Sequence, residues 1–378
     1  MKIFQTKWSL GSAWTPPLKE DRAVNLVFFF GSTTHLKERR ELPQIKKSYP
    51  NAVFFGCSTA GEIFGTQVFD ESLTVTAVQL ENTALRIVYG RIEEPGKSLE
   101  VGRALACQLE KKDLVHVFVL SDGLHVNGSD LVKGLVEQLP QGVAVTGGLS
   151  GDAARFQETL ILGKDGVPER DGVALLGMYG NRLKIGYASL GGWDPFGPER
   201  FITRSEGNVL FELDGKSALG LYKQYLGEHA KGLPATGLLF PLSLRFPEGE
   251  SGIVRTILAV DEKDQSITFA GTMPQGAAAR FMKANFDRLI DGASGAAKAS
   301  HSSASPSDPD LAILISCVGR KLILKQRVEE EVEAVREVLG PKTTLTGFYS
   351  YGEISPFTPG AKCELHNQTM TITTFTEI

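Results

Sequence analysis

The sequence predicts an α/β protein that continues into an α+β part. Apolar runs of strand length alternate with helical segments, and one strand–helix–strand layout occurs twice before residue 179 and once more near the end of the chain. The 378 residues, 42% of them hydrophobic, are enough for a large core and for more than one domain. We therefore divide the chain into a first domain, residues 1–179, and a second domain, residues 180–378.

The first copy of the layout begins with the apolar run Asn25–Phe30, which predicts a buried strand. A polar segment of helical character follows over residues 36–48. A second apolar run, Ala52–Gly56, leads into the turn Ser58–Ile63, and the alternating strand Leu73–Val78 closes the unit.

The middle stretch repeats this layout. Val115–Leu120 predicts a strand and residues 129–139 predict a helix. Val143–Thr146 predicts a second strand, which ends in the glycine-rich turn Gly147–Asp152. A strand–helix–strand unit of this length favours parallel pairing with a right-handed crossover.

The last stretch repeats it again, with a strand at Ala312–Ile315, a helix over residues 325–339 and an alternating strand at Thr369–Thr373. Its turn Ser350–Ile354 ends in Gly-Glu-Ile, as Ser58–Ile63 does in the first unit. This recurrence in two of three units favours divergent duplication, although any α/β protein contains strand–helix–strand units.

Three carboxylates follow these strands and their glycine turns: Glu62, Asp152 and Glu353. Ligands of open α/β sheets bind just beyond the carboxyl ends of the strands. The sequence therefore predicts that the three carboxylates mark the edges of a ligand site.

The segment between the middle and last units does not follow the strand–helix–strand layout. Arg182–Leu190 predicts a strand, and Glu206 and Gly207 predict the turn of a hairpin. Residues 277–290 predict a helix, and residues 292–309, rich in Gly, Ser, Ala and Pro, predict a flexible connection.

Composition and charge exclude several classes of function. A formal net charge of -4 with scattered Lys and Arg argues against a nucleic-acid-binding surface. No apolar run approaches the roughly 20 residues that a membrane helix needs. The first residues lack the layout of a secretory signal, and four separated cysteines indicate free thiols, so we expect a cytoplasmic protein.

The sequence gives little support for catalysis. No GxSxG motif is present, and a structural zinc site would need a second ligand pair beside Cys363 and His366. Ser58 and Cys57 follow a strand, where a nucleophile would lie, but a turn that needs small residues explains them more simply. We therefore expect a binding protein and not an enzyme.

Seven motifs resemble a known family. The first three resemble the N-terminal FIST domain, and the other four resemble the C-terminal FIST domain. They are residues 55–63, 121–123 and 146–152, then 192–198, 203–208, 347–354 and 365–371. The resemblance covers nearly the whole chain, so residues 1–179 are identified as a FIST N-terminal ligand-sensing domain and residues 180–378 as a FIST C-terminal domain.

The resemblance implies a sensory input protein that binds a small ligand. One bacterial branch of stand-alone FIST proteins is similar in binding haem and responding to nitric oxide. By this resemblance we expect non-covalent haem b, with regulation of a separate histidine kinase, diguanylate cyclase or phosphodiesterase. An amino-acid or metabolite sensor without haem is the alternative. A hydrolase or transferase that uses Ser58 or Cys57, a scaffold without ligand and a homodimer all stay open.

Candidate haem ligands are His366, beside an apolar residue at the start of a strand, and His125, in a loop before a helix. A histidine hydrogen-bonded to nearby backbone is the simpler interpretation of each.

A polar pocket between the two domains would use other groups. Arg204 can hold a carboxylate through two parallel hydrogen bonds, and Glu353 or Asp122 can receive an ammonium group. Trp193, Tyr349 and Tyr351 can form its walls. The complete predicted ligand set is Glu62, Asp122, Asp152, Trp193, Arg204, Tyr349, Tyr351, Glu353 and Asn367.

Overall fold

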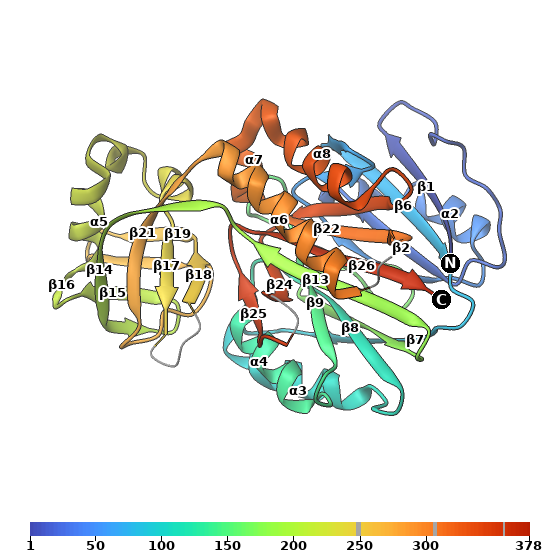
Figure 1. Ribbon diagram of the computed structural model, residues 1–378, viewed down its shortest axis with the longest axis horizontal. Helices are drawn as coiled ribbons and strands as arrows, with labels where there is room; N and C mark the ends of the chain where they lie inside the picture. Colours follow the sequence, from blue (N-terminus) through green and yellow to red (C-terminus); the bar gives the residue numbers. More distant parts are fainter. Residues whose placement is uncertain (247–250, 305–307, 358–359) are drawn as a thin grey trace.

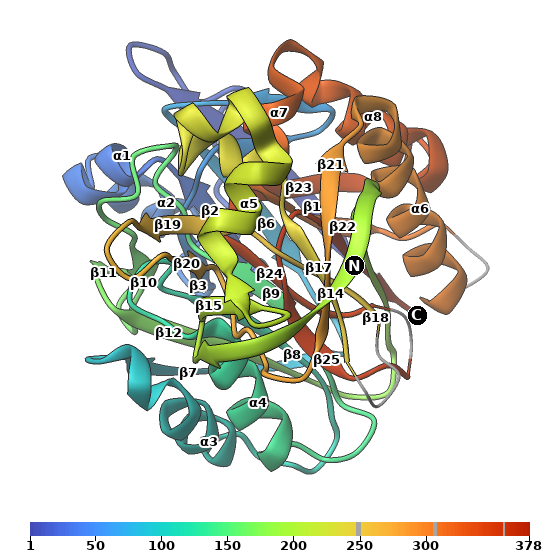
Figure 2. The ribbon, with the colours of Figure 1, turned by 90° about the vertical axis from the view of Figure 1, so that its left-hand side faces the viewer.

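The chain forms a larger body of three similar units and a smaller lobe, residues 193–284, beside it (Figure 1). This computed structural model describes residues 1–246, 251–304, 308–357 and 360–378. Figure 2, turned toward the lobe, shows the lobe in front of the body. No helix in these described ranges is both long enough and apolar enough to cross a membrane.

Each unit of the body supplies four long strands. The first unit has β1 (Lys2–Ser9), β2 (Leu26–Gly31), β3 (Val53–Ser58) and β6 (Ser72–Gln79). The second has β7 (Ala84–Arg91), β8 (Leu114–Ser121), β9 (Ala144–Leu149) and β12 (Gly172–Tyr179). The third has β13 (Leu183–Leu190), β22 (Leu311–Cys317), β23 (Thr344–Ser350) and β26 (Met370–Glu377).

The three units have the same sheet topology. Their strand orders are β1-β6-β2-β3, β7-β12-β8-β9 and β13-β26-β22-β23. In each unit the last two strands of this order are parallel and the other neighbours are antiparallel. The internal repeat that the sequence predicts is therefore present as a repeated topology.

Each unit also lends a short hairpin to the sheet of another unit. The hairpins are β4 (Glu62–Phe64) with β5 (Gln67–Phe69), β10 (Ile161–Leu162) with β11 (Pro168–Glu169), and β24 (Gly352–Pro356) with β25 (Cys363–His366). The first hairpin extends the third sheet along β23, the second extends the first sheet along β3, and the third extends the second sheet along β9. This cyclic exchange brings the ends of strands from all three units together.

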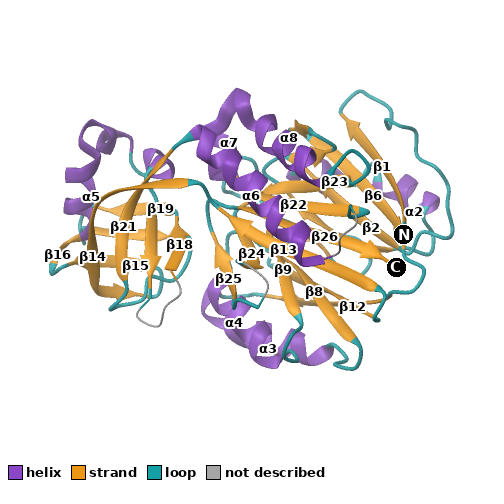
Figure 3. Ribbon diagram, in the orientation of Figure 1, coloured by secondary structure: helices purple, strands orange, loops and turns teal. Residues whose placement is uncertain are grey.

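Helices cover the body on two sides, as Figure 3 shows for α3 and α4 on one side and α6, α7 and α8 on another. The helices of the body are α1 (Thr33–Glu38), α2 (Leu42–Ser48), α3 (Ser98–Gln108), α4 (Gly128–Gln138), α6 (Phe286–Ala304), α7 (Val318–Leu324) and α8 (Val328–Leu339). Helix α8 buries Val332, Val335 and Leu339, the apolar face that its sequence spacing predicts.

The lobe is inserted in the third unit between β13 and α6. Its elements are β14 (Trp193–Glu206), β15 (Val209–Leu213), β16 (Lys216–Ser217), α5 (Ala218–Leu226), β17 (Leu242–Arg245), β18 (Ser251–Arg255), β19 (Ile257–Asp261), β20 (Ser266–Phe269) and β21 (Ala278–Ala284). The lobe has its own apolar core, which includes Ile202, Tyr222 and Phe281. The buried Arg255 joins it to the body by donating to Leu365 O at 2.9 Å.

The mixed α/β and α+β fold class is confirmed, and three local predictions are corrected. The first half of the predicted helix 277–290 is instead strand β21, which pairs with β14, and only residues 286–290 are helical, as the start of α6. Residues 292–304 belong to helix α6, because the small residues that resemble a linker are the face that packs closely on the body: a Cβ at Gly292 would lie 2.0 Å from Gly191 O. Residues 305–307 of that predicted connection lie outside the described part.

The predicted helix over residues 36–48 is two helices, α1 and α2. They are separated at Arg39, which adopts φ 56°, and Pro43 lies in the first turn of α2. The domain boundary between residues 179 and 180 stays a prediction. Strand β13, directly after it, pairs along its whole length with β26.

Candidate functional site

A glycine at the same position in each unit brings the second strand close to the first. Gly56, Gly147 and Gly347 lie opposite Phe29, Val119 and Leu314 in the three parallel strand pairs. A Cβ on any of these glycines would lie 1.8 Å from the carbonyl oxygen of the residue opposite. The strand ends that carry the candidate site therefore require glycine for steric reasons.

Six residues after that glycine, the first and third units each place a buried glutamate. Glu62 accepts hydrogen bonds from Thr59 Oγ1 and from Ser72 Oγ, the latter at 2.6 Å. Glu353 accepts from Ser350 Oγ at 2.6 Å and from Thr369 Oγ1 at 3.1 Å.

Both glutamates thus tie the turn of their unit to the start of its last strand. Burial raises the pKa of Glu62 from 4.5 to about 7 and that of Glu353 from 4.5 to about 8. The glutamate of the recurring Gly-Glu-Ile sequence therefore has a structural role: it connects the turn to the last strand of its unit.

The second unit departs from this pattern, since Ala153 stands six residues after Gly147. It has two buried carboxylates, Asp122 and Asp152. Asp122 accepts from the backbone N–H of Leu124 at 2.8 Å and of His125 at 2.5 Å. Asp122 thus caps the turn before α4, as Ser32 caps α1.

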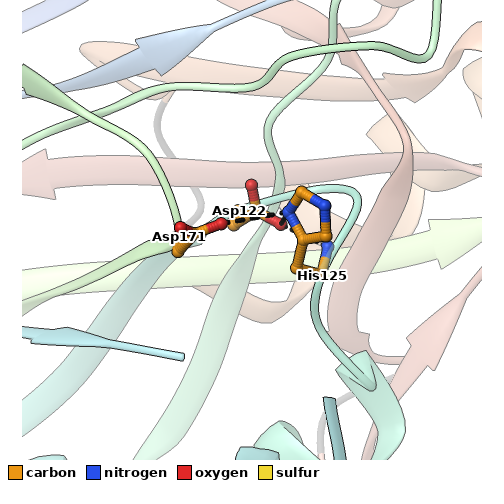
Figure 4. A group of neighbouring side chains, drawn as sticks. All are labelled: Asp122, His125 and Asp171. Atoms are coloured by element: carbon orange, nitrogen blue, oxygen red, sulfur yellow. Dashed lines mark hydrogen bonds and ion pairs between the residues drawn. The ribbon is translucent and has the colours of Figure 1, made fainter. Parts of the chain in front are cut away.

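Asp122, His125 and Asp171 form a group that could hold a metal ion (Figure 4). His125 Nδ1 lies 3.0 Å from Asp171 Oδ1, and the His125 side chain is 58% exposed. In the second unit His125 thus connects the turn after β8 to the residue before β12. The first unit connects the equivalent segments through a backbone carbonyl, since His35 Nε2 donates to Glu71 O at 3.1 Å. The repeated tie explains the position of His125 without a metal or a haem.

His366 is fully buried and neutral. Its Nε2 donates to Ser355 O at 2.7 Å, and its ring lies 4.2 Å from the Phe357 ring. Burial lowers the pKa of His366 from 6.5 to about 4. Neither cavity described below is lined by His366 or His125.

A cavity of about 240 Å³, here called the Glu62 cavity, lies where the ends of the three units meet. Its lining consists of Ser32, Thr59, Ala60, Gly61, Glu62, Asp70, Glu71, Ala153, Ala154, Arg155, Val318, Lys321 and Leu322. Residues 32–71 belong to the first unit, 153–155 to the second and 318–322 to helix α7 of the third.

Lys321 supplies a cation to this cavity from the third unit. Its Nζ donates to Ala60 O at 2.9 Å and pairs with Asp70. A Cβ at Gly61 would lie 2.4 Å from Lys321 Nζ, so a glycine there makes room for the amine. The ring of the buried Tyr349 lies 5.5 Å from the same Nζ.

Arg155 supplies a second cation, from the second unit. Its guanidinium contacts Asp152 Oδ1 at 2.6 Å and Glu71 Oε1 at 3.0 Å. The Glu62 cavity thus presents a carboxyl group that titrates near neutrality, two cations and two further carboxylates. Such a lining can bind a small polar molecule that carries both donors and acceptors.

A second, more open cavity of about 450 Å³ adjoins the same segment and is here called the outer cavity. It is lined by Thr33, Thr34, Lys37, Glu38, Asp152, Arg155, Gln157 and Glu158. Arg155 lines both cavities.

The structure brings only part of the predicted ligand set together. Glu62 lines the first cavity and Asp152 the second. Tyr349 lies beneath Lys321 and donates to Glu331 Oε1 at 2.7 Å. Tyr351 donates to Ala153 O at 3.2 Å, and so supports the wall of the cavity without lining it.

The remaining predicted residues lie elsewhere. Trp193 is buried where the lobe joins the body and donates to Gln368 O at 2.9 Å. Arg204 is on the lobe, where it pairs with Glu212 at 2.9 Å. Asn367 is 1% exposed, and its amide atoms have no hydrogen-bond partner within the described ranges. Neither cavity includes Trp193, Arg204 or Asn367.

Sequence reasoning missed Lys321 and Arg155. Neither belongs to a motif, and each comes from a different unit than Glu62. The sequence contains one indirect indication of such a neighbour. Gly61, in the recurring turn, has no side chain and so leaves the space that Lys321 fills.

The two candidate nucleophiles serve structural roles. Ser58 Oγ donates to Gly151 O at 2.8 Å and accepts from Leu160 N at 2.8 Å. Cys57 is fully buried, and burial raises the pKa of its thiol well above the usual value.

Solved structures similar to this chain over nearly its whole length are enzymes by name. A chorismatase shares 10% identity at a TM-score of 0.36, over 99% of this chain and 98% of that chain. A cyanuric acid hydrolase from A. caulinodans shares 7% identity at a TM-score of 0.37, with the same coverage, and another cyanuric acid hydrolase shares 9% at 0.37, over 100% of this chain and 99% of that chain.

The expectation that the chain is not an enzyme is corrected on this finding. At these TM-scores, however, the likeness carries no argument about substrate or mechanism.

Comparison of sequences identifies the family. An uncharacterized protein of Methanocaldococcus jannaschii is 24% identical over 223 residues, which are 55% of this chain and 42% of that relative. This chain therefore spans less than half the length of that relative. The FIST N domain model matches residues 25–216 and the FIST C domain model matches residues 218–356. The chain belongs to the FIST family of signalling-related, ligand-sensing domains.

Proposed function

We propose that this protein is a sensory input module that binds a small polar molecule in the Glu62 cavity. The observation that carries the proposal is the meeting of all three units at one cavity that contains a buried carboxyl group and the Lys321 amine. A ligand there contacts residues from all three units of the body at once. A ligand that binds more tightly to one arrangement of these units than to another shifts the body toward that arrangement.

The size and charge of the cavity favour the amino-acid or metabolite alternative. Pockets for drug-sized ligands are roughly 300–1,000 Å³, so about 240 Å³ suits a smaller molecule. Lys321 and Arg155 can hold a carboxylate, while Glu62, Asp70 and Glu71 can accept an ammonium group. A free amino acid or a similar small zwitterion satisfies both ends.

Haem b with nitric oxide as signal was the first specific expectation, and the residues around its candidate ligands do not fit it. His366 Nδ1 has no hydrogen-bond partner among the described residues, but the side chain is fully buried against Phe357 and lines neither cavity, so no space for haem adjoins it. His125 is mostly exposed and linked to Asp171. A haemin titration tests this: a stoichiometric Soret band that is lost in His366→Ala or His125→Ala would restore haem and contradict the proposed ligand.

Regulation of a separate histidine kinase, diguanylate cyclase or phosphodiesterase is part of the same proposal. Family membership supports it, since FIST domains are signalling-related. Ligand binding would then shift the population of a partner-binding state. Pull-down of a genomically neighbouring kinase or cyclase, with and without ligand, tests this step.

The ligand itself is found by a thermal-shift screen of amino acids and small metabolites. A molecule that binds the folded state raises the Tm by mass action. In Glu62→Gln and Lys321→Met the shift should disappear. Glu353→Gln is the matched control, because Glu353 makes the same structural bonds but lines neither cavity. If Glu353→Gln abolishes the shift and Glu62→Gln does not, the proposed site is wrong.

Proton-transfer catalysis at the same cavity is a second candidate function. The pKa of Glu62, raised to about 7, is one that general acid–base catalysis uses. Turnover of a screened metabolite, followed by NMR and lost in Glu62→Gln, would favour this function. Binding without turnover favours the sensor.

A further inference from the structure

One segment separates the two cavities, and its features differ from those of the corresponding segments in the other units. Residues 152–158, here called the strap, supply Asp152, Gln157 and Glu158 to the outer cavity and Ala153 and Ala154 to the Glu62 cavity. Arg155 is in the strap and lines both cavities, so its side chain forms the partition between them.

The strap lacks the tie that fixes the equivalent turns. The first and third units place Glu62 and Glu353 at this position, each hydrogen-bonded to the last strand, whereas the second unit has Ala153. Ala153 (φ 50°) and Phe156 (φ 53°) both adopt left-handed backbone conformations that residues with side chains rarely take. A strained turn without its carboxylate tie stays in place only through other contacts.

Backbone bonds such as Ala153 N–H to Thr59 O, the bond from Glu158 N–H to Asp152 and the ion pairs of Glu158 supply some of these contacts. Two side chains supply the contacts nearest the cavities. Arg155 bridges Asp152 in the strap to Glu71 in the first unit, at 2.6 and 3.0 Å. Tyr351 of the third unit accepts from Phe156 N and donates to Ala153 O, both at 3.2 Å. The rings of Phe156 and Tyr351 stack with centroids 4.4 Å apart. The Tyr351 contacts hold the base of the strap, and the bond from Arg155 to Glu71 closes the partition.

We infer that Arg155 is a gate that decides which molecules reach Glu62. With the Arg155–Glu71 bond made, the Glu62 cavity admits only molecules that fit about 240 Å³. When the bond opens, the Glu62 cavity joins the outer cavity, and longer molecules with the same polar end can enter. The inference rests on the proposed function, since it concerns selection at the same site.

The test measures access to the cavity and needs no ligand. Ala60→Cys places a thiol in the lining of the Glu62 cavity, in a Cys107→Ser background because Cys107 is the exposed native cysteine and the other three are buried. Labelling rates are measured with a small and a bulky methanethiosulfonate. The partition is then removed with Arg155→Ala or weakened with Glu71→Gln. Arg103→Ala is the control, because Arg103 is an exposed arginine that pairs with Glu137 of α4, outside the strap, and lines neither cavity.

For a gate, Arg155→Ala should raise the rate with the bulky reagent by up to about fivefold, the most that one exposed ion pair ordinarily supplies, and the rate with the small reagent much less. Glu71→Gln should raise the rate with the bulky reagent by a smaller factor, and Arg103→Ala should leave both rates unchanged. Leu322→Cys, a partly exposed rim position, should label equally in all backgrounds. Equal rates with the bulky reagent in Arg155→Ala and Arg103→Ala would overturn the gate.

If Ala60→Cys does not fold, amide hydrogen exchange gives the same answer in chains without it. The Ala153 N–H donates to Thr59 O at 3.2 Å and reports opening of the strap. Its exchange should be faster in Arg155→Ala than in Arg103→Ala, and equal exchange would overturn the gate. Because neither measurement uses a ligand, the gate can stand where the thermal-shift screen fails, and can fail where that screen succeeds.

Discussion

Two buried glutamates with the same bonding have different surroundings. Glu62 and Glu353 each join a turn to the last strand of their unit, but only Glu62 lines a cavity. The recurrence of a glutamate in two units therefore reflects a shared structural role. Only Glu62 also belongs to a candidate site, because Lys321 and Arg155 line the same cavity.

The raised pKa of Glu353 predicts a pH-dependent stability. Between the unfolded value of 4.5 and about 8, the folded protein keeps a proton that the unfolded chain releases. The free energy of unfolding therefore falls by on the order of 5 kcal/mol from this group as pH rises through this window, and it is level above it. Glu353→Gln should remove that part of the fall. Urea unfolding of both chains at about pH 5 and about pH 8 measures it, and equal falls in the two would contradict the assignment.

Strand pairs are the elements that position the site, and each depends on one glycine. Gly56, Gly147 and Gly347 let the second strand of each unit approach the first, which sets where the following turn begins. A side chain at Gly56 would push β3 away from β2 and so displace the turn that carries Glu62.

Gly56→Ala should destabilise the protein by more than about 3 kcal/mol, since its Cβ would lie 1.8 Å from Phe29 O. Gly96→Ala is the matched control, because its Cβ would meet no atom within 4 Å and its φ is not left-handed; its effect should stay within about 0.5 kcal/mol. The denaturant midpoints of the two variants measure this difference. Similar midpoints would show that the pair β2–β3 tolerates a side chain at position 56.

Elements with a strong local pattern could be predicted from the sequence. The apolar strands and helix α8 follow from their periodicity, as do the turns after Gly56 and Gly347. Helix α6 was missed because close packing on the body selects small residues that also occur in linkers. Glu62 and Asp152 were predicted from strand ends. Lys321 and Arg155 could not be, because only the exchange of hairpins between units brings them to Glu62.

That cyclic exchange governs the whole molecule. Each sheet of the body is completed by a hairpin from another unit, so no unit has its full set of strand partners alone. The site at the junction exists only when all three units are assembled.

A fragment of residues 1–190 should therefore fail to unfold as one cooperative transition. This fragment keeps only β13 of the third unit. Without the rest of that unit, β9 loses its partner β24, the hairpin β4–β5 loses β23, and β13 loses β26. Unpaired backbone groups at these edges destabilise the remaining sheets. Circular dichroism during urea titration checks this. A fragment with a sharp transition near that of the full chain would show that the first two units fold alone.

The most direct test of the account is a crystal structure of the full chain with the strongest molecule from the thermal-shift screen. The account predicts electron density for that molecule within hydrogen-bonding distance of both Glu62 and Lys321. Density at the junction of lobe and body, near Trp193 and Asn367, with the Glu62 cavity holding only water, would contradict it.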